Sequence, residues 1–160
     1  MQTMGVRHIP VTTSERDDRI DTALAMWWVA TVDAFVRTVG QEKALIALTP
    51  VFRQIGRQDA LKVAMDKKII GHDAIALATY VNFWEEMMGI QGKIVESTPD
   101  RVVKENYSCP LARGPPEACK LLELSINGSA EEMSPDFSFM GTHAMTKGDH
   151  ICRWVIERRR

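Results

Sequence analysis

The sequence predicts an α+β fold in which three to four helices pack on one face of a small antiparallel sheet. Up to about Gly89, apolar residues recur every three or four positions, the period of an amphipathic helix. After Gly89, short runs alternate between apolar and polar residues, the period of a half-buried strand. The 160 residues contain no linker or internal repeat. We therefore expect a single domain over 1–160, with a helical front (1–89) and a hairpin–helix–hairpin back (90–160).

Three helical segments make up the predicted front. The first covers 14–39, where Ser14 can cap the start and Gly40 favours a left-handed stop. The second covers 41–68, and we expect Pro50 to break it into two shorter helices because proline removes a backbone donor. The third begins near Asp73 and ends at Gly89.

The predicted back begins with a hairpin. Residues 93–96 and 101–104 flank a Ser-Thr-Pro-Asp turn. A short helix over 117–126 follows, and we expect it to end at the Asn127-Gly128 pair.

A second hairpin is predicted over 136–156, turning at Gly148-Asp149. Counting outward from that turn places Met145 opposite Cys152 and His143 opposite Trp154. These four residues would then share the inward face of the sheet.

The charge balance excludes several classes of partner. Lys and Arg number 20 against 21 Asp and Glu, and the pI is near 6.4, so no strong field attracts nucleic acid or an anionic membrane. The longest apolar stretch, 23–32, is about half of the ~20 residues that a membrane span needs. No positive region precedes that stretch as in a signal peptide, and the number of cysteines is odd. We therefore expect a cytoplasmic protein with no nucleic-acid or membrane partner.

The three cysteines are the main candidates for chemistry. Cys109 and Cys119 flank the loop before the short helix, and Cys152 begins the last strand, so they could converge with His143. Three thiolates and an imidazole suit Zn²⁺, although the spacing lacks the tight Cys pair of most zinc sites. Alternatively, Cys119 at a helix start could act as a nucleophile with His143 as base. Each cysteine could also be a small buried hydrophobic residue.

Aromatic and methionine pairs are the other conspicuous feature. They occur at Trp27-Trp28, Phe83-Trp84 and Met87-Met88. Such pairs usually belong to a core, but their density permits an apolar pocket between the helices and the sheet.

The motifs of the last fifty residues resemble one enzyme family. Cys109-Pro110, then Cys119 with Glu123 after it, then Thr146-x-Gly148-Asp149-x-x-Cys152 are similar to the L-2-amino-thiazoline-4-carboxylic acid hydrolase family. This resemblance implies a hydrolase that opens a small cyclic C–N substrate of the thiazoline or amidine type. The expected catalytic residues are Cys109, Cys119 and His143, and the expected substrate contacts are Arg113, Tyr107 and Trp154. Arg113 would hold the substrate carboxylate.

The final Gly-Asp-x-x-Cys-Arg-Trp also resembles the end of 4-vinyl reductase domains, which are ligand-binding α+β modules of sensors. Some of those sensors hold zinc through cysteines and a glutamate, but the corresponding positions here lie near Gly141 and Ala144, so that set is not reproduced. The alternative function is therefore a non-catalytic small-molecule-binding or sensor module that can form a homodimer. If either protein class holds Zn²⁺ here, the ligands would be Cys109, Cys119, Cys152 and His143.

Overall fold

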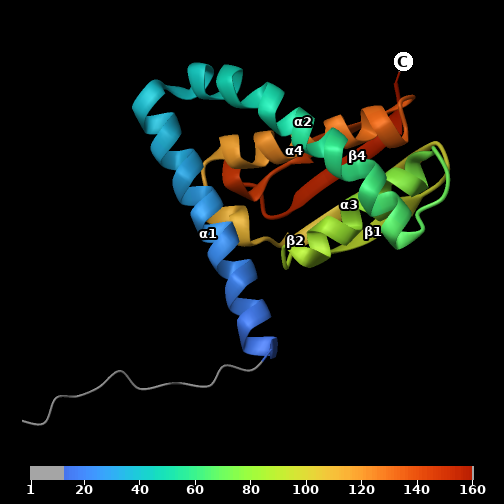
Figure 1. Cartoon of the computed structure of the whole chain (residues 1–160), viewed down its shortest axis with the longest axis horizontal. Helices are drawn as coiled ribbons and strands as arrows, with labels where there is room; N and C mark the ends of the chain where they lie inside the picture. Colours follow the sequence, from blue (N-terminus) through green and yellow to red (C-terminus); the bar gives the residue numbers. More distant parts are fainter. Residues whose placement is uncertain (1–12, 160) are drawn as a thin grey trace, which may run out of the picture.

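The computed structural model describes residues 13–159, without the side chains of residues 13, 15–22 and 24. Four α-helices and four strands follow one another in the predicted α+β arrangement (Figure 1). The helices are α1 (Thr13–Val39), α2 (Gln41–Lys67), α3 (Ala74–Met87) and α4 (Pro116–Met133). The strands are β1 (Gln91–Ser97), β2 (Arg101–Ser108), β3 (Phe137–His143) and β4 (Cys152–Arg158), and two 3-10 turns are η1 (Pro110–Arg113) and η2 (Met145–Lys147).

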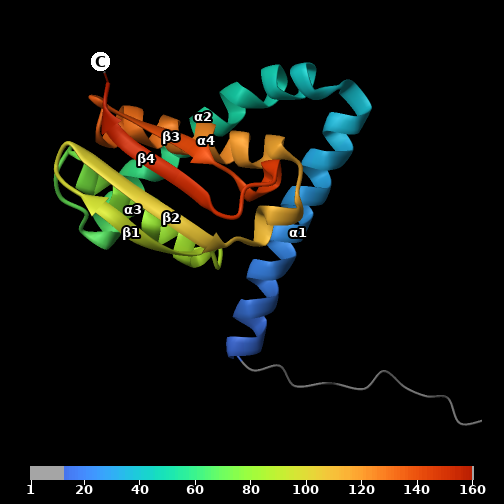
Figure 2. The same ribbon diagram turned by 180° about the vertical axis from the view of Figure 1, so that it is seen from behind.

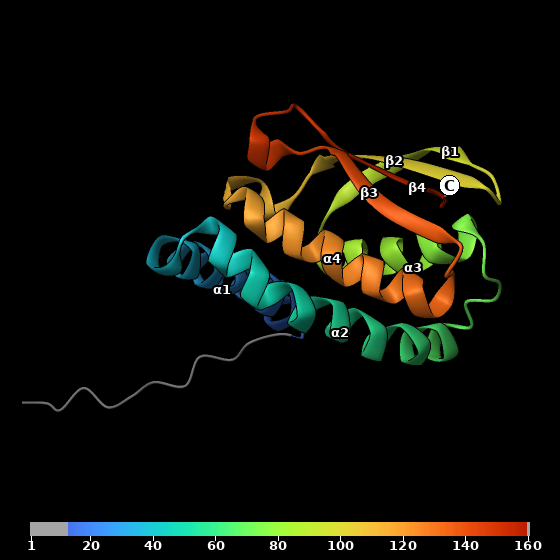
Figure 3. The ribbon, with the colours of Figure 1, turned by 90° about the horizontal axis from the view of Figure 1, so that it is seen from above.

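The four strands form one antiparallel sheet in the order β1-β2-β4-β3. Seen from the side, all helices lie on one face of this sheet, as the sequence predicts (Figure 3). Viewed from behind, β1 to β4 lie in front of the helices and α1 runs along one end (Figure 2). Apolar residues of the inner face, among them Phe137, Trp154 and Ile156, pack with Leu77 of α3 to form the main core.

The front helices begin and end close to the predicted residues, with two corrections. Helix α1 begins at Thr13, so Ser14 is its second residue rather than a preceding cap. Helix α2 is continuous through Pro50, whereas the sequence predicted a break. The carbonyl that lacks a partner because of Pro50 belongs to the exposed Ile46, where water can hydrate it. Within the described residues, no helix combines the length and apolar character that a membrane span requires.

Helix α4 is longer than the predicted 117–126 because it crosses α2 at very close range. A Cβ atom added at Gly56 would lie 1.9 Å from the Ser125 carbonyl oxygen. One added at Gly128 would lie 2.2 Å from the Arg53 carbonyl oxygen. Gly128 therefore does not end the helix; it lets the two backbones touch.

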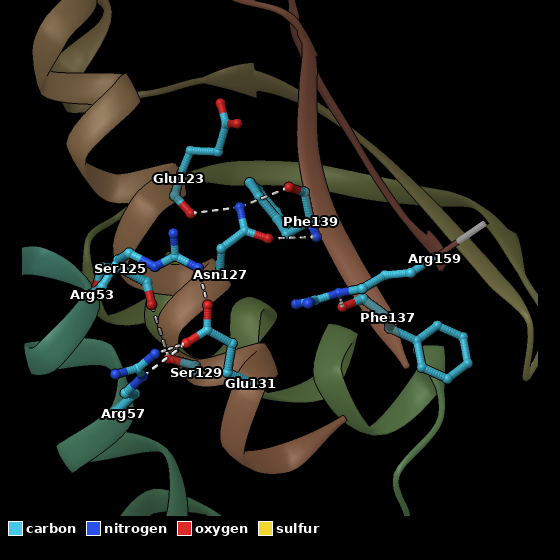
Figure 4. A network of polar contacts seen from close by, with 10 residues as sticks. All are labelled: Arg53, Arg57, Glu123, Ser125, Asn127, Ser129, Glu131, Phe137, Phe139 and Arg159. Carbon is cyan, nitrogen blue, oxygen red and sulfur yellow. Dashed lines mark hydrogen bonds and ion pairs between the residues drawn. The ribbon is translucent and has the colours of Figure 1, made fainter. Parts of the chain in front are cut away.

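Polar side chains fix this crossing and attach α4 to the sheet (Figure 4). Arg53 and Arg57 of α2 both donate to the Glu131 carboxylate of α4. The Asn127 amide donates to the Phe139 carbonyl oxygen at 2.9 Å and accepts from the Phe139 N–H at 3.1 Å. Asn127 thus pairs with β3 as a neighbouring strand would, which explains why it does not end the helix.

The connection between β3 and β4 differs from the predicted two-residue turn. Strand β3 ends at His143 and β4 begins at Cys152, so the connection has room for the 3-10 turn η2. Gly148 ends that turn with φ 95°, in the left-handed region that favours glycine. The Asp149 carboxylate accepts from the Ala144 N–H at 2.8 Å and closes the loop.

This longer connection changes the predicted register. Gly141 pairs with Trp154, and a bulge then places His143 opposite Arg153 rather than opposite Trp154. Met145 lies in η2 and not in the strand. The prediction that His143 and Met145 share the inward face with Trp154 is therefore wrong.

Candidate functional site

All three cysteines are free, half-buried and contribute to the lining of one cavity of about 260 Å³. We call it the thiol cavity; Cys109 reaches it from the end of β2, Cys119 from the first turns of α4, and Cys152 from the start of β4. The Cys152 sulfur accepts from the Met145 N–H at 3.3 Å, and the Cys119 sulfur accepts from the Thr146 hydroxyl at 3.5 Å. Turn η2 thus holds two of the thiols in place, while their chemical roles stay predictions.

The electrostatics of this cavity keep two of the thiols protonated at neutral pH. Burial raises the pKa of Cys109 to about 11, and the neighbouring thiols add to the rise. Burial also raises the pKa of Cys119, and the hydrogen bond from Thr146 opposes that rise only in part. The helix start near Cys119 was expected to favour its thiolate, whereas burial raises the pKa of this thiol.

The structure gives no support to the predicted Zn²⁺ ligands. Among the side chains that the structure describes, no three from His, Cys, Asp or Glu come close enough together to hold a metal ion. His143 contributes to the lining of the thiol cavity, but it is exposed and lies beside Thr142 and opposite Arg153.

The predicted substrate contacts are dispersed. Arg113 and Tyr107 are exposed and line neither of the two cavities described here. Trp154 lines the thiol cavity, and its indole N–H donates to the Glu85 carboxylate at 2.8 Å. Lys147 also lines that cavity and has no ion-pair partner among the described residues, so it is better placed than Arg113 to meet a carboxylate.

A second and larger cavity, of about 470 Å³, lies among α1, α2, α3 and α4. We call it the helical cavity. Its lining is mostly aromatic, aliphatic and thioether side chains: Ala25, Trp28, Phe52, Ile55, Tyr80, Val81, Trp84, Met87, Met88, Leu122 and Ile126, with Asp59, Glu85 and Ser125 as the polar members besides the Tyr80 hydroxyl and Trp84 indole N–H. The aromatic pairs of the sequence thus contribute to a pocket, but it lies between helices rather than between helices and sheet.

No pattern in the sequence predicts the polar centre of the helical cavity. One oxygen of Asp59, on α2, accepts from the Tyr80 hydroxyl at 3.0 Å and from the Trp84 indole N–H at 2.9 Å. The Ser129 hydroxyl donates to the Tyr80 oxygen at 2.9 Å. Burial raises the pKa of Tyr80 far above its ordinary value, and the Asp59 charge adds to the rise, so Tyr80 stays a donor. A lone aspartate inside α2 carries no motif that could have predicted this role.

A buried ionic network separates the two cavities, and Glu85 of α3 lines both of them. One Glu85 oxygen accepts from Lys104 at 2.7 Å, and the other accepts from Asn106 at 2.6 Å and from Trp154. Lys104 is only 3% exposed and Glu85 is 7% exposed. This carboxylate is therefore fully paired with protein groups.

The comparisons with known proteins find likeness of fold only. No protein-family model and no curated protein sequence matches the chain. Among solved structures, the chain is similar to the phenol-responsive sensory domain of the transcription activator PoxR with phenol, with TM-score 0.63 and 12% identity over 86% of this chain and 74% of that one. It is also similar to a trafficking protein particle complex subunit 3 from Naegleria fowleri covalently bound to palmitic acid, with TM-score 0.58 and 10% identity over 89% of this chain and 97% of that one. At these identities the shared property is the α+β fold, and a sensory domain is among the proteins that have it.

Proposed function

We propose that this protein is a small-molecule-binding module, of the kind found in sensory domains, that takes a small aromatic or apolar ligand in the helical cavity. The observation that carries the proposal is the combination of a large apolar space with one polar anchor, Asp59 held by Tyr80 and Trp84. Small-molecule sites typically combine a mostly apolar lining with a few placed polar groups.

The volume of the helical cavity supports a ligand of one or two rings. Ligand pockets commonly measure about 300–1,000 Å³, and a cavity of about 150 Å³ is enough for benzene. At about 470 Å³, the helical cavity has room for a ring and a short substituent. Trp28 and Phe52, whose ring centroids are 4.7 Å apart, supply aromatic surface on the sides formed by α1 and α2.

Hydrolysis by the thiol cavity has less support. A cysteine nucleophile must be ionised, whereas burial raises the pKa of both Cys109 and Cys119. The predicted base His143 is exposed and lies opposite Arg153. Lys147 could still hold a substrate carboxylate, so the Cys119→Ser variant remains the direct test of this alternative. Loss of thiazoline hydrolysis in that variant would favour the enzyme.

Two other properties stay predictions from the sequence. A homodimer would place α1 and α2 against a second copy, because both helices leave apolar side chains exposed, for example Trp27 and Met65. Sedimentation velocity on the purified chain measures this. A cytoplasmic location is supported by the three free thiols.

Calorimetric titration with phenol, indole and naphthalene tests the proposed ligand site. We expect saturable binding of at least one probe, and a loss of at least about tenfold in affinity in Ala25→Phe, which fills the cavity from α1. The matched control Ala30→Phe lies on the exposed side of the same helix and should bind as the unaltered chain does. If Ala25→Phe fails to fold by circular dichroism, Ser125→Leu fills the cavity from α4 instead. No saturable binding by any probe, or equal binding by the filled variants, would overturn the proposal.

A further inference from the structure

The charged side chains described in the lining of the helical cavity are all acids. Among the side chains that the structure describes, the acids that line it are Asp59 and Glu85, and no Lys, Arg or His contributes to the lining. A carboxylate that is removed from water costs free energy unless it is paired; Glu85 is buried, and Asp59 is partly buried. The partners of these two acids therefore decide which charge the cavity offers to a ligand.

Glu85 is neutralised by the protein itself. Lys104 pairs with one of its oxygens at 2.7 Å, and Asn106 and Trp154 occupy the other. All of these partners are buried residues of the sheet. Glu85 thus presents no free acceptor to the helical cavity.

Asp59 is held only by neutral donors. Tyr80 and Trp84 both bond to the same oxygen, Oδ2. Among the side chains that the structure describes, none donates to Oδ1 and none forms an ion pair with Asp59. Oδ1 is therefore an acceptor without a described donor, and it belongs to a residue that lines a cavity with no cation among its described side chains.

From this difference between Glu85 and Asp59 we infer that the ligand is a small amine that carries a positive charge. Its ammonium group pairs with Asp59, and its aromatic or branched apolar body fills the space toward Trp28 and Phe52. The inference rests on the proposed function and names its ligand class. The Trp84 indole N–H meets the Asp59 carboxylate with the edge of its ring, so the attraction between the ammonium and Asp59 is one of charge.

The same geometry excludes the opposite charge. A fatty acid or an amino-acid-derived carboxylate in this cavity would face two acids and no base. Such ligands would have to take up a proton and become neutral before they could bind in this cavity. Neutral phenols could donate to Oδ1 but would leave the Asp59 charge without a counter-ion.

Three probes of nearly equal shape test the inference by calorimetric titration of the full chain: 2-phenylethylamine, 2-phenylethanol and phenylacetate. We expect the amine to bind at least about tenfold more tightly than the alcohol, and phenylacetate to bind weakest. Asp59→Asn keeps an acceptor for Tyr80 and Trp84 but removes the charge. It should lower the affinity for the amine by at least about tenfold and change that for the alcohol by less than about threefold.

Asp66→Asn is the matched control, because Asp66 is exposed on the same helix and lines neither cavity. It should leave all three affinities unchanged. Equal binding of amine and alcohol by the unaltered chain would overturn the inference, even if Asp59→Asn cannot be folded. That result would leave the proposed function standing, whereas failure of these probes and of the neutral aromatics together would remove both.

Discussion

Replacing Gly56 with alanine tests the close helix crossing that forms one wall of the helical cavity. The added Cβ would lie 1.9 Å from the Ser125 carbonyl oxygen and 2.8 Å from its carbonyl carbon. Ordinary contacts begin near 3.4 Å, so α2 and α4 would have to part by about 1.5 Å. No rotamer change can relieve the clash, because both atoms belong to the backbone.

The expected cost follows from two opposing effects. Overpacking of a close contact typically costs about 1–3 kcal/mol, and a backbone clash belongs at the upper end of that range. The higher helix propensity of alanine relative to glycine offsets this loss of stability by about 1 kcal/mol. We therefore expect Gly56→Ala to lower the free energy of unfolding by about 2 kcal/mol, which is a fall in Tm of about 4–8 °C for a chain of this length.

Urea denaturation followed by circular dichroism measures this loss. Gly141→Ala is the control, since a Cβ there would meet its nearest atom, a Glu123 carboxylate oxygen, at 3.7 Å. It should change the free energy of unfolding by less than about 0.5 kcal/mol. If Gly56→Ala proves as stable as the unaltered chain, α2 and α4 are not in backbone contact, and the wall of the helical cavity must be placed differently.

Two further predictions concern buried polar groups. Lys104→Met should lower the free energy of unfolding by about 3–5 kcal/mol, because the Glu85 carboxylate stays buried without its cation. Lys120→Met, which breaks a surface pair with Glu123, should cost less than about 1 kcal/mol in the same urea titration, and equal losses would argue against a buried pair. Because burial raises the pKa of Tyr80, the folded chain keeps the phenol proton where the unfolded chain releases it, so the free energy of unfolding should decline above about pH 10. Tyr80→Phe should lessen that decline in melts from pH 8 to about pH 11, whereas Tyr107→Phe, on the exposed side of β2, should leave it unchanged.

The fold could be predicted wherever a local signal decided it. The change of apolar period near Gly89 located the boundary between helices and strands, and Asp73 caps α3 through a 2.9 Å bond to the Ala76 N–H. The error over the end of α4 comes from tertiary contact. Asn127-Gly128 looks like a helix end, but the glycine serves the crossing with α2 and the asparagine pairs with β3.

The candidate site was harder to predict because its residues come from four helices. Cysteines are rare, so the sequence drew attention to the thiol cavity, and the structure does bring Cys109, Cys119 and Cys152 to it. Asp59 is one of many acids on amphipathic helices, and only the packing of α3 against α2 shows that its neighbours are Tyr80 and Trp84. No spacing rule connects residues 21 and 25 positions apart on two different helices.

Asp59 and Glu85 line the same cavity, yet among the described side chains only Glu85 is paired with a cation. Glu85 pairs with Lys104, so its charge is already balanced within the protein. From the described side chains Asp59 receives only neutral donors, so a cationic ligand would supply the counter-ion that they do not. Proteins of similar fold hold phenol in one case and palmitic acid in another, so the fold by itself does not choose the ligand. In this chain we expect Asp59 Oδ1 to decide which class of ligand binds, because no described side chain donates to it.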